Sequence, residues 1–435
     1  MITHSTFQLI RDPRRIAVWF AFVLAGISLA TVTSPATAAN RATELFGDNS
    51  SMVRQIRVID LASGDKFSTG SGFIISPEGL MATNYHVVSS YIHEPEKFRL
   101  EAILQDDSVE TLDLIAVDVV HDLAIVTAGK AVETHFELSK KPLSKGDRIY
   151  SMGNPLDLGQ TIIEGTYNGL VENSRYRKIL FSGSLNPGMS GGPALNSNGE
   201  VIGINVSKGG EQISFLVPVA HLATLLEDAR AATDSTDFST RIAADLMADQ
   251  QRFYDDVIAS MNSERELGEL QVPKKLHPSL NCWGHSVDDE DIRYEATHQH
   301  CQSEDAIFIS REIYLGSFRY SFEFAETEEL NRFQFYKLLE SRFMHRPSYV
   351  HADEDEITPY RCHDDKLSLT SGNWKVSTCM RSFRELGGLL EVSMVMASLD
   401  YPDKAAVVKV SSSGISRENA FLLLRSMAEA VAWKR

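Results

Sequence analysis

The chain has 435 residues, of which 43% are hydrophobic and 23% are charged. This composition is typical of a soluble globular protein with two or three domains. The formal net charge of −17 excludes a protein that binds nucleic acid by neutralising phosphates in bulk. With 27 glycines and 14 prolines, the chain is also excluded from the collagen-like and low-complexity classes.

The N-terminus, residues 1–38, has the order of a secretory signal peptide. Three basic residues, Arg11, Arg14 and Arg15, precede an apolar run over 16–30, and a small-residue triplet ends at Ala38. We expect cleavage after Ala38 and a periplasmic or secreted protein with no stable membrane span. The alternative is an uncleaved anchor, although about 15 apolar residues fall short of the roughly 20 that cross a bilayer.

Residues 48–230 are predicted to form short strands joined by turns. Residues 53–61 alternate between apolar and polar, and a helix is expected over 219–231 after Pro218. The Asn198-Gly199 pair predicts a tight hairpin in which both residues take positive φ. Regular short strands of this kind indicate an all-β barrel or sandwich.

The rest of the chain is predicted to contain a linker with one helix and then a separate α+β domain. The linker, residues 231–275, contains an amphipathic helix over 241–263, whose apolar side chains we interpret as core packing. These side chains are Ile242, Leu246, Phe253, Val257 and Met261. The α+β domain covers 276–435, with strands expected within 305–325 and 388–399 and helices over 327–343 and 416–433.

All four cysteines lie in this C-terminal region, at Cys282, Cys301, Cys362 and Cys379. An oxidising compartment would allow two disulfides, for which three pairings exist. We favour Cys282–Cys301 and Cys362–Cys379, because short loops close with the smallest loss of entropy. The alternative is four buried free thiols.

Three segments of the β-rich half carry residues suited to nucleophilic catalysis. Ser190 lies in GMSGGP, where glycines allow an exposed hydroxyl and backbone N–H groups aimed at one point. His86 ends a strand in ATNYHVV, and Asp122 starts an apolar strand in HDLAIV. Each alone has an ordinary structural interpretation, but together they follow the His-Asp-Ser order of one known serine triad.

The sequence resembles the trypsin-like peptidases, and most closely their bacterial HtrA/Deg-type branch. The resemblance covers about 48–225 and is carried by GSGFIISPEGLMATNYHVV, HDLAIV, GNPLDLGQTIIEGTYNGLV and LNPGMSGGPALNSNGEVIGIN. It implies an all-β double six-stranded barrel with the site between the barrels. The chain departs from the branch in showing no recognisable PDZ domain. It also departs at Met189, where the family has Asn or Asp, so what holds the oxyanion loop is open.

By this resemblance, the chain is an exported serine endopeptidase that acts on unfolded or damaged proteins. His86 would take the proton of Ser190, Asp122 would orient the imidazole, and the N–H groups of Gly188 and Ser190 would bind the oxyanion. The reaction passes through an acyl-enzyme and needs no cofactor and no metal. Partners would be protein or peptide substrates and no nucleic acid. The alternative is a non-cleaving chaperone or binding protein on a protease scaffold.

The resemblance also places Ser184 at the base of the pocket for the residue before the scissile bond. The predicted pocket wall, which would add the substrate as a strand, consists of Asn205, Val206, Ser207 and Lys208. Because Ser184 carries no charge, we expect cleavage after small or medium apolar residues. The C-terminal domain, which shows no second Ser-Gly-Gly segment, is expected to bind substrates or partners, or to be a structural cap.

Overall fold

A computed structural model describes residues 37–231, 237–289, 291–345 and 352–434. Residues 42–435 form one compact unit, and residues 1–41 form another. The expected signal peptide lies outside the described residues except for its last two, which begin helix α1 (Thr37–Asn49). None of the described helices is long and apolar enough to cross a membrane.

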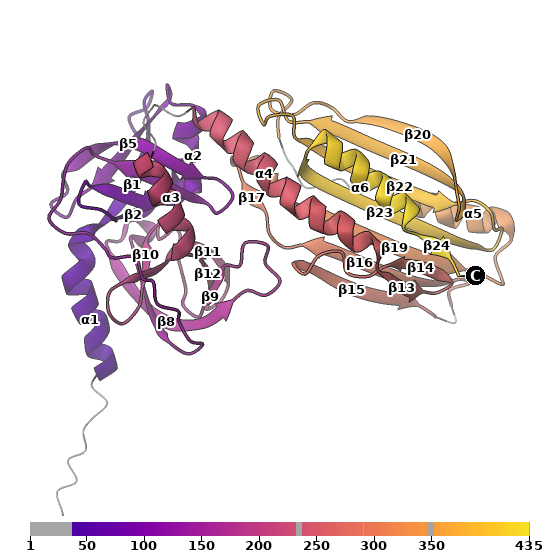
Figure 1. Cartoon of the computed structure of the whole chain (residues 1–435), viewed down its shortest axis with the longest axis horizontal. Helices are drawn as coiled ribbons and strands as arrows, with labels where there is room; N and C mark the ends of the chain where they lie inside the picture. The colour runs from indigo at the N-terminus through magenta and orange to yellow at the C-terminus, as the bar shows by residue number, and fades with distance from the viewer. Residues whose placement is uncertain (1–36, 232–236, 290, 346–351, 435) are drawn as a thin grey trace, which may run out of the picture. The chain divides into compact units, whose positions relative to one another are not determined.

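The first barrel is a closed six-stranded sheet with the strand order β1-β2-β3-β6-β5-β4 (Figure 1). The predicted alternation over 53–61 becomes β1, which places Ile56 and Val58 fully inside the barrel. Helix α2 (Tyr85–His93) follows β3, and η1 (Ser50–Met52) precedes β1. The strands are β1 (Val53–Asp60), β2 (Lys66–Ile74), β3 (Leu80–Thr83), β4 (Phe98–Ile103), β5 (Val109–Asp118) and β6 (Leu123–Thr127).

The second barrel is also closed, with the strand order β10-β11-β12-β9-β8-β7. Its strands are β7 (Arg148–Gly153), β8 (Thr161–Leu170), β9 (Ile179–Phe181), β10 (Pro193–Leu195), β11 (Val201–Gly210) and β12 (Ile213–Pro218). A short η2 (Pro155–Asp157) follows β7, and α3 (Val219–Ala231) forms where we expected a helix. The predicted all-β double barrel is confirmed.

The turn between β10 and β11 differs in one respect from the prediction. The two strands pair antiparallel as expected, but only Gly199 has positive φ, at 82°. Asn198 does not, because the side chain of Asn196 shapes this turn by accepting the N–H groups of Asn198 and Glu200 at 2.8 and 3.1 Å. The hairpin is therefore closed by a side-chain cap.

Helix α4 (Phe238–Ala259) and η3 (Ser260–Asn262) correspond to the helix expected over 241–263. All five of its predicted stripe residues are buried. The helix starts earlier than expected because Asp237 caps it, accepting the N–H of Ser239.

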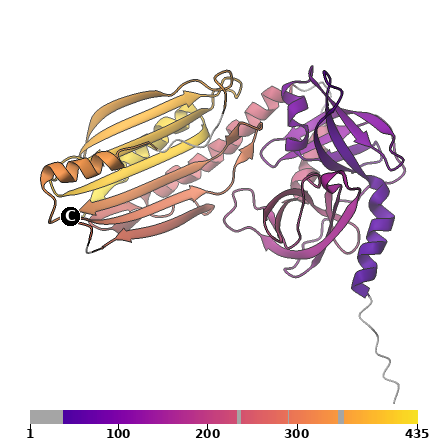
Figure 2. The ribbon, with the colours of Figure 1, turned by 180° about the vertical axis from the view of Figure 1, so that it is seen from behind.

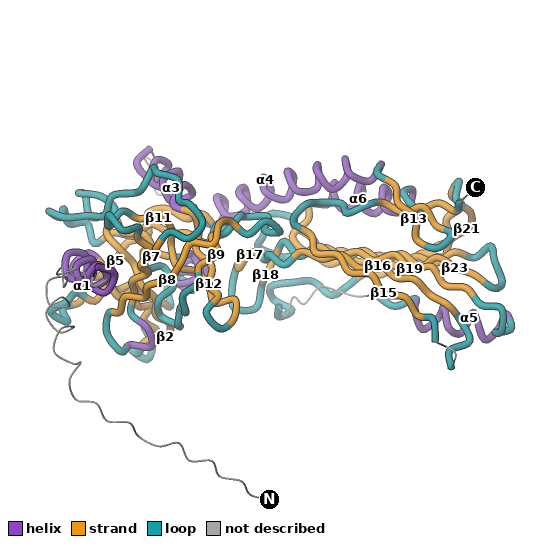
Figure 3. The backbone as a smooth tube through the Cα atoms, turned by 90° about the horizontal axis from the view of Figure 1, so that it is seen from below, coloured by secondary structure: helices purple, strands orange, loops and turns teal. Residues whose placement is uncertain are grey.

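The C-terminal region is built on a seven-stranded antiparallel sheet with the order β15-β16-β19-β23-β22-β21-β20. Helices α4 and α6 (Arg417–Glu429) lie on one face, and α5 (Arg332–Arg342) lies on the other (Figures 2 and 3). The strands are β15 (Leu280–Val287), β16 (Glu295–Ser303), β19 (Phe318–Glu326), β20 (Arg361–Leu369), β21 (Gly372–Ser382), β22 (Leu390–Ser398) and β23 (Lys404–Ile415).

Two boundaries differ from our expectations. Strands β13 (Glu264–Leu267) and β14 (Leu270–Pro273), which we assigned to the linker, form a small sheet with β24 (Ala432–Trp433). Their apolar side chains are buried in the core of the C-terminal region, together with those of the second half of α4. The strand expected from 305 is also interrupted, because β17 (Ile307–Phe308) and β18 (Tyr314–Leu315) pair only with each other.

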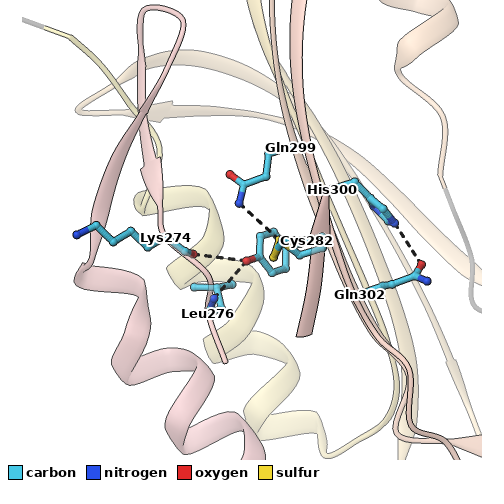
Figure 4. The surroundings of a disulfide bond; sticks show 8 residues. Lys274, Leu276, Cys282, Gln299, His300 and Gln302 are labelled. Carbon is cyan, nitrogen blue, oxygen red and sulfur yellow. Dashed lines mark hydrogen bonds between the residues drawn. A yellow bond between two sulfur atoms is a disulfide. The ribbon is translucent and has the colours of Figure 1, made fainter. Parts of the chain in front are cut away.

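The two disulfides join Cys282 to Cys301 and Cys362 to Cys379, which are the favoured pairs. Each joins directly opposite residues of neighbouring strands, β15–β16 and β20–β21. Figure 4 shows the surroundings of the first disulfide. There the hydroxyl of Tyr320 accepts the N–H of Leu276 at 3.2 Å, which ties the chain before β15 to β19.

Candidate active site

His86 and Asp122 are joined by two hydrogen bonds in the first barrel. Nδ1 of His86 lies 2.7 Å from Oδ2 of Asp122, and the backbone N–H of His86 donates to Oδ1 at 2.9 Å. Asp122 stands just before β6 with φ of 57°, and Asn84 donates to its backbone carbonyl at 2.8 Å. The turn and the start of α2 therefore hold the carboxylate and the ring in one fixed arrangement.

The pKa of His86 lies above its ordinary value of 6.5. Burial favours the neutral ring and acts to lower the pKa, but the charge of Asp122 and its hydrogen bond outweigh this effect. The imidazole keeps 28% of its side-chain surface exposed. This combination suits a proton acceptor that becomes a stabilised cation.

Ser190 lies between the second barrel and strand β2 of the first. Its backbone carbonyl accepts the N–H of Ser71 at 2.7 Å, and its Oγ donates to the carbonyl of Val206 at 3.1 Å. Gly191 beside it has φ of 84°, and a Cβ there would lie 2.2 Å from the carbonyl oxygen of Ser71. Glycine is thus required for the close approach of the serine turn to the first barrel.

The peptide between Pro187 and Gly188 is oriented so that the N–H of Gly188 faces away from the η2 loop. The carbonyl of Pro187 accepts the N–H of Leu156 at 2.9 Å, and the trans peptide points the N–H of Gly188 in the opposite direction. Within the described part of the chain, no carbonyl accepts the N–H of Gly188 or of Ser190. Two backbone donors therefore remain available for an oxyanion.

Met189 is fully buried, and its side chain packs among Ile149, Phe181 and Leu185. The loop is held instead by two residues that we did not predict for this role. Ser71 donates to the carbonyl of Gly188 at 2.7 Å, and Asn205 donates to the carbonyl of Met189 at 3.2 Å. Apolar packing and hydrogen bonds to the backbone thus take the place of the polar side chain that Met189 lacks.

Our assignment of Asn205 to the substrate-binding wall needs correction. Its side chain is fully buried and also bonds to Ser151 and Met152, at 2.8 and 2.9 Å. The amide nitrogen donates two hydrogen bonds and the amide oxygen accepts one, so the hydrogen-bonding groups of this side chain are paired inside the barrel. Asn205 therefore supports the oxyanion loop from behind.

The other predicted wall residues lie along the same strand or close to it. Val206 lines a cavity of about 370 Å³ beside His86, whereas Ser184 is not among the residues that line it. Ser207 and Lys208 continue β11 next to Val206, and their side chains lie outside the described residues.

The cavity beside His86 contains residues that sequence reasoning missed. Phe308 and Tyr314 of the β17–β18 hairpin contribute aromatic rings to it, although they follow His86 by 222 and 228 residues in the sequence. The cavity is lined by His86, Val119, Val120, His121, Asp122, Tyr176, Lys178, Val206, Val217, Pro218, Ala306, Ile307, Phe308 and Tyr314. Among the described residues, no cluster of three or more side chains is suited to hold a metal.

Two closed six-stranded antiparallel barrels are the fold of a trypsin-like peptidase domain, and the first of them carries the bonded pair of His86 and Asp122. Residues 70–204 match the family model described as a trypsin-like peptidase domain. The chain thus contains such a domain, with relatives among the HtrA/Deg serine proteases.

Two curated relatives show this similarity. HhoB of Synechocystis sp. is 32% identical over 171 residues, which cover 37% of this chain and 40% of the relative. The mitochondrial serine protease HTRA2 of Drosophila erecta is 31% identical over 194 residues, which cover 41% of this chain and 44% of the relative. The chain therefore spans less than half the length of each.

Among solved structures, the serine endoprotease from Yersinia pestis is 26% identical to the matched region. The match covers 43% of this chain and 66% of that one, with a TM-score of 0.38.

Proposed function

We propose that this protein is a serine endopeptidase in which Ser190 is the nucleophile and His86 the general base. The observation that carries the proposal is the pair of hydrogen bonds between His86 and Asp122, beside a serine turn with two available N–H donors. Asp122 would fix the tautomer of His86 and stabilise the imidazolium.

The reaction transfers an acyl group in two balanced steps. Oγ of Ser190 attacks the scissile carbonyl while Nε2 of His86 takes the hydroxyl proton, and the N–H groups of Gly188 and Ser190 bind the oxyanion. The tetrahedral intermediate then breaks its C–N bond, and His86 gives the proton to the leaving amine. Water then attacks the acyl carbon while His86 takes its proton. The ester bond to Oγ of Ser190 breaks, and His86 returns the proton to Oγ.

The reactive arrangement requires one rotation. In this structure the Ser190 hydroxyl donates to the carbonyl of Val206, so it has to rotate about its Cα–Cβ bond away from that carbonyl before it can donate to His86. Catalytic hydrogen bonds in unliganded sites often tighten only when substrate binds.

The substrates we propose are unfolded or damaged proteins outside the cytoplasm, cut after small or medium apolar residues. Two disulfides and the similarity to HtrA-type proteases support export. The absence of charge on Ser184 supports the apolar preference. In this proposal residues 1–38 are a signal peptide, 48–230 the protease, and 264–435 a second domain.

The competing function is a non-cleaving binding protein, which the orientation of the Ser190 hydroxyl toward Val206 favours. A fluorophosphonate probe distinguishes the two, because it labels only a serine activated by its base and oxyanion donors. We expect stoichiometric labelling of the purified protein, none in Ser190→Ala, and digestion of unfolded casein by the wild type alone. A wild-type protein that neither labels nor cleaves would establish the binding function instead.

A further inference from the structure

The C-terminal region extends a hairpin onto the protease barrels. Residues 304–317 leave the seven-stranded sheet between β16 and β19 and form the β17–β18 pair. Three isoleucines of this hairpin and Leu315 are buried, with exposures between 1% and 5%. They belong to the same apolar cluster as Tyr85, Val87 and Val88 of helix α2. The hairpin thus packs on the helix that carries His86.

Polar contacts fix the tip of the hairpin to the first barrel. The carbonyl of Ile309 accepts the hydroxyl of Tyr85 at 3.2 Å and lies 3.2 Å from Nε2 of His93. Burial raises the pKa of Tyr85, so its hydroxyl stays a neutral donor. The guanidinium of Arg311 stacks 4.1 Å from the ring centre of Phe67 on β2.

The base of the hairpin is fixed to the second barrel through Asp305. This carboxylate accepts the hydroxyl of Ser174 at 3.1 Å and the backbone N–H of Arg175 at 2.5 Å. Lys178 lies 3.9 Å from it, so the positive charge next to the cavity has a partner. The hairpin therefore contacts both barrels and contributes residues to the cavity beside His86.

Two aromatic side chains of the hairpin face the catalytic histidine. Phe308 and Tyr314 are opposite each other in the β17–β18 register, with ring centres 5.4 Å apart. The ring of Phe308 lies edge-on to the imidazole of His86 at 5.9 Å. Both rings line the cavity beside His86, and Tyr314 is 45% exposed.

We propose that Phe308 and Tyr314 form the specificity subsite for the P2 residue, the second residue before the scissile bond. The inference rests on the proposed peptidase function. A substrate added to β11 is extended, and its side chains alternate between two faces. If the P1 side chain enters the pocket above Ser184, the P2 side chain points the other way, toward His86 and the hairpin.

The lining selects an apolar P2 side chain. Besides the two rings, the half-buried Val206 lines the cavity, and a Leu or Phe side chain would bury the apolar surface that these residues expose. A charged P2 side chain would lose water without gaining a free partner. Lys178, which would attract a carboxylate, lies beside Asp305, and Asp122, which would attract an ammonium, is bonded to His86. The second domain therefore completes the substrate site of the first.

The experiment measures kcat/KM for peptides that differ only at P2, with Leu, Phe, Gly, Asp and Lys compared. We expect the wild type to prefer Leu or Phe over Gly by roughly 10-fold to 100-fold, as apolar pockets discriminate. Phe308→Ala and Tyr314→Ala should lose most of this preference by cutting Leu and Phe peptides more slowly, with P1 preference unchanged. Phe308→Leu should keep apolar selection.

The matched control is Phe333→Ala on α5, which removes an aromatic ring that is 85% exposed and away from the cavity. It should retain the wild-type P2 profile. Thermal melting of each variant distinguishes a loss of folding from a loss of P2 selection. If Phe308→Ala does not fold, Phe308→Leu still tests the subsite, because it keeps an apolar side chain at this position.

Four outcomes would overturn the proposal. Unchanged P2 selection in folded variants would show that the rings do not line the subsite. A faster reaction of Phe308→Ala with every peptide would show that the hairpin blocks the cleft. A wild type that labels with fluorophosphonate and cleaves without P2 selection would refute the subsite alone. A wild type that does neither would refute the peptidase function as well.

Discussion

Asp122 accepts two hydrogen bonds from His86, one from the ring and one from the backbone N–H of the same residue. The second bond fixes the carboxylate relative to the start of α2, so that the first can select the ring tautomer. In Asp122→Asn, the NH₂ group of the new side chain can face Nδ1 of His86 in place of Oδ2. The N–H on Nδ1 then loses its acceptor, and the other ring tautomer is favoured. We expect kcat to fall roughly 10⁴-fold with the fold retained, since loss of this carboxylate has that effect in such triads. Peptide hydrolysis and circular dichroism test this expectation, and near-normal kcat would contradict it.

The raised pKa of His86 predicts the pH dependence of activity. The base must be neutral to accept the Ser190 proton, so kcat/KM should rise with pH through a midpoint above 6.5. Residual activity of Asp122→Asn should show a lower midpoint, because the charge that raises the pKa is gone. Profiles of kcat/KM between pH 5 and pH 9 measure both midpoints. A wild-type midpoint below that of the variant would reverse the assigned direction.

Ser71 is predicted to be a positioning residue for the oxyanion loop. Its hydroxyl donates to the carbonyl of Gly188 and accepts the N–H of Asn154 at 2.9 Å. Ser71→Ala should lower kcat by roughly 10-fold to 100-fold with little change in KM, because the loss falls on transition-state binding. The control is Ser341→Ala on α5, whose hydroxyl bonds only to its own helix. Equal changes in kcat and thermal stability for the two variants would refute the role.

A histidine pair near the site predicts sensitivity to acid. His221 stacks on His121 with ring centres 3.7 Å apart, and His121 bonds to Asp118 at 2.7 Å. Burial, followed by the charge of His121, lowers the pKa of His221 to about 4 from 6.5. Between these values the unfolded chain binds more protons than the native one, so the free energy of unfolding falls as pH drops from 6.5 toward 4.

The test replaces His221 by Gln, which cannot take up the proton. The wild type should lose stability to urea between pH 6.5 and pH 4 more steeply than His221→Gln. Parallel loss in both proteins would show that another group controls the acid transition.

The barrels and the local disulfides could be predicted because their signals lie in neighbouring residues. Alternation sets β1, short loops set the cysteine pairs, and glycines mark the serine turn. The support of the oxyanion loop could not be predicted in this way. Ser71 reaches Gly188 across 117 residues of sequence, and nothing in either segment indicates the partner. Asn205 was assigned to the cleft because its neighbours are there, but one residue along a strand reverses the face.

The contact between the hairpin and helix α2 also had no signal in the sequence. Tyr85 and Ile309 are 224 residues apart in the sequence. The isoleucines of the hairpin fit the pattern of a strand in the C-terminal sheet equally well. Their burial depends on the surface of another domain, which only tertiary structure reveals. The sequence alone therefore does not distinguish a structural cap from a substrate-binding domain.

The same contact predicts the behaviour of a chain that ends at Ala231. Removing the rest takes away the carbonyl of Ile309 that bonds to Tyr85, and with it the hairpin's buried residues Ile307 and Ile309, which share an apolar cluster with helix α2. We expect the shortened protein to melt at a lower temperature, to bind a hydrophobic dye and to aggregate, because contiguous apolar surface is left open to water. Size-exclusion chromatography and thermal melting measure this against the full chain. A monomeric shortened protein of unchanged stability, with unchanged P2 selection, would show that the hairpin neither covers the barrel core nor completes its substrate site.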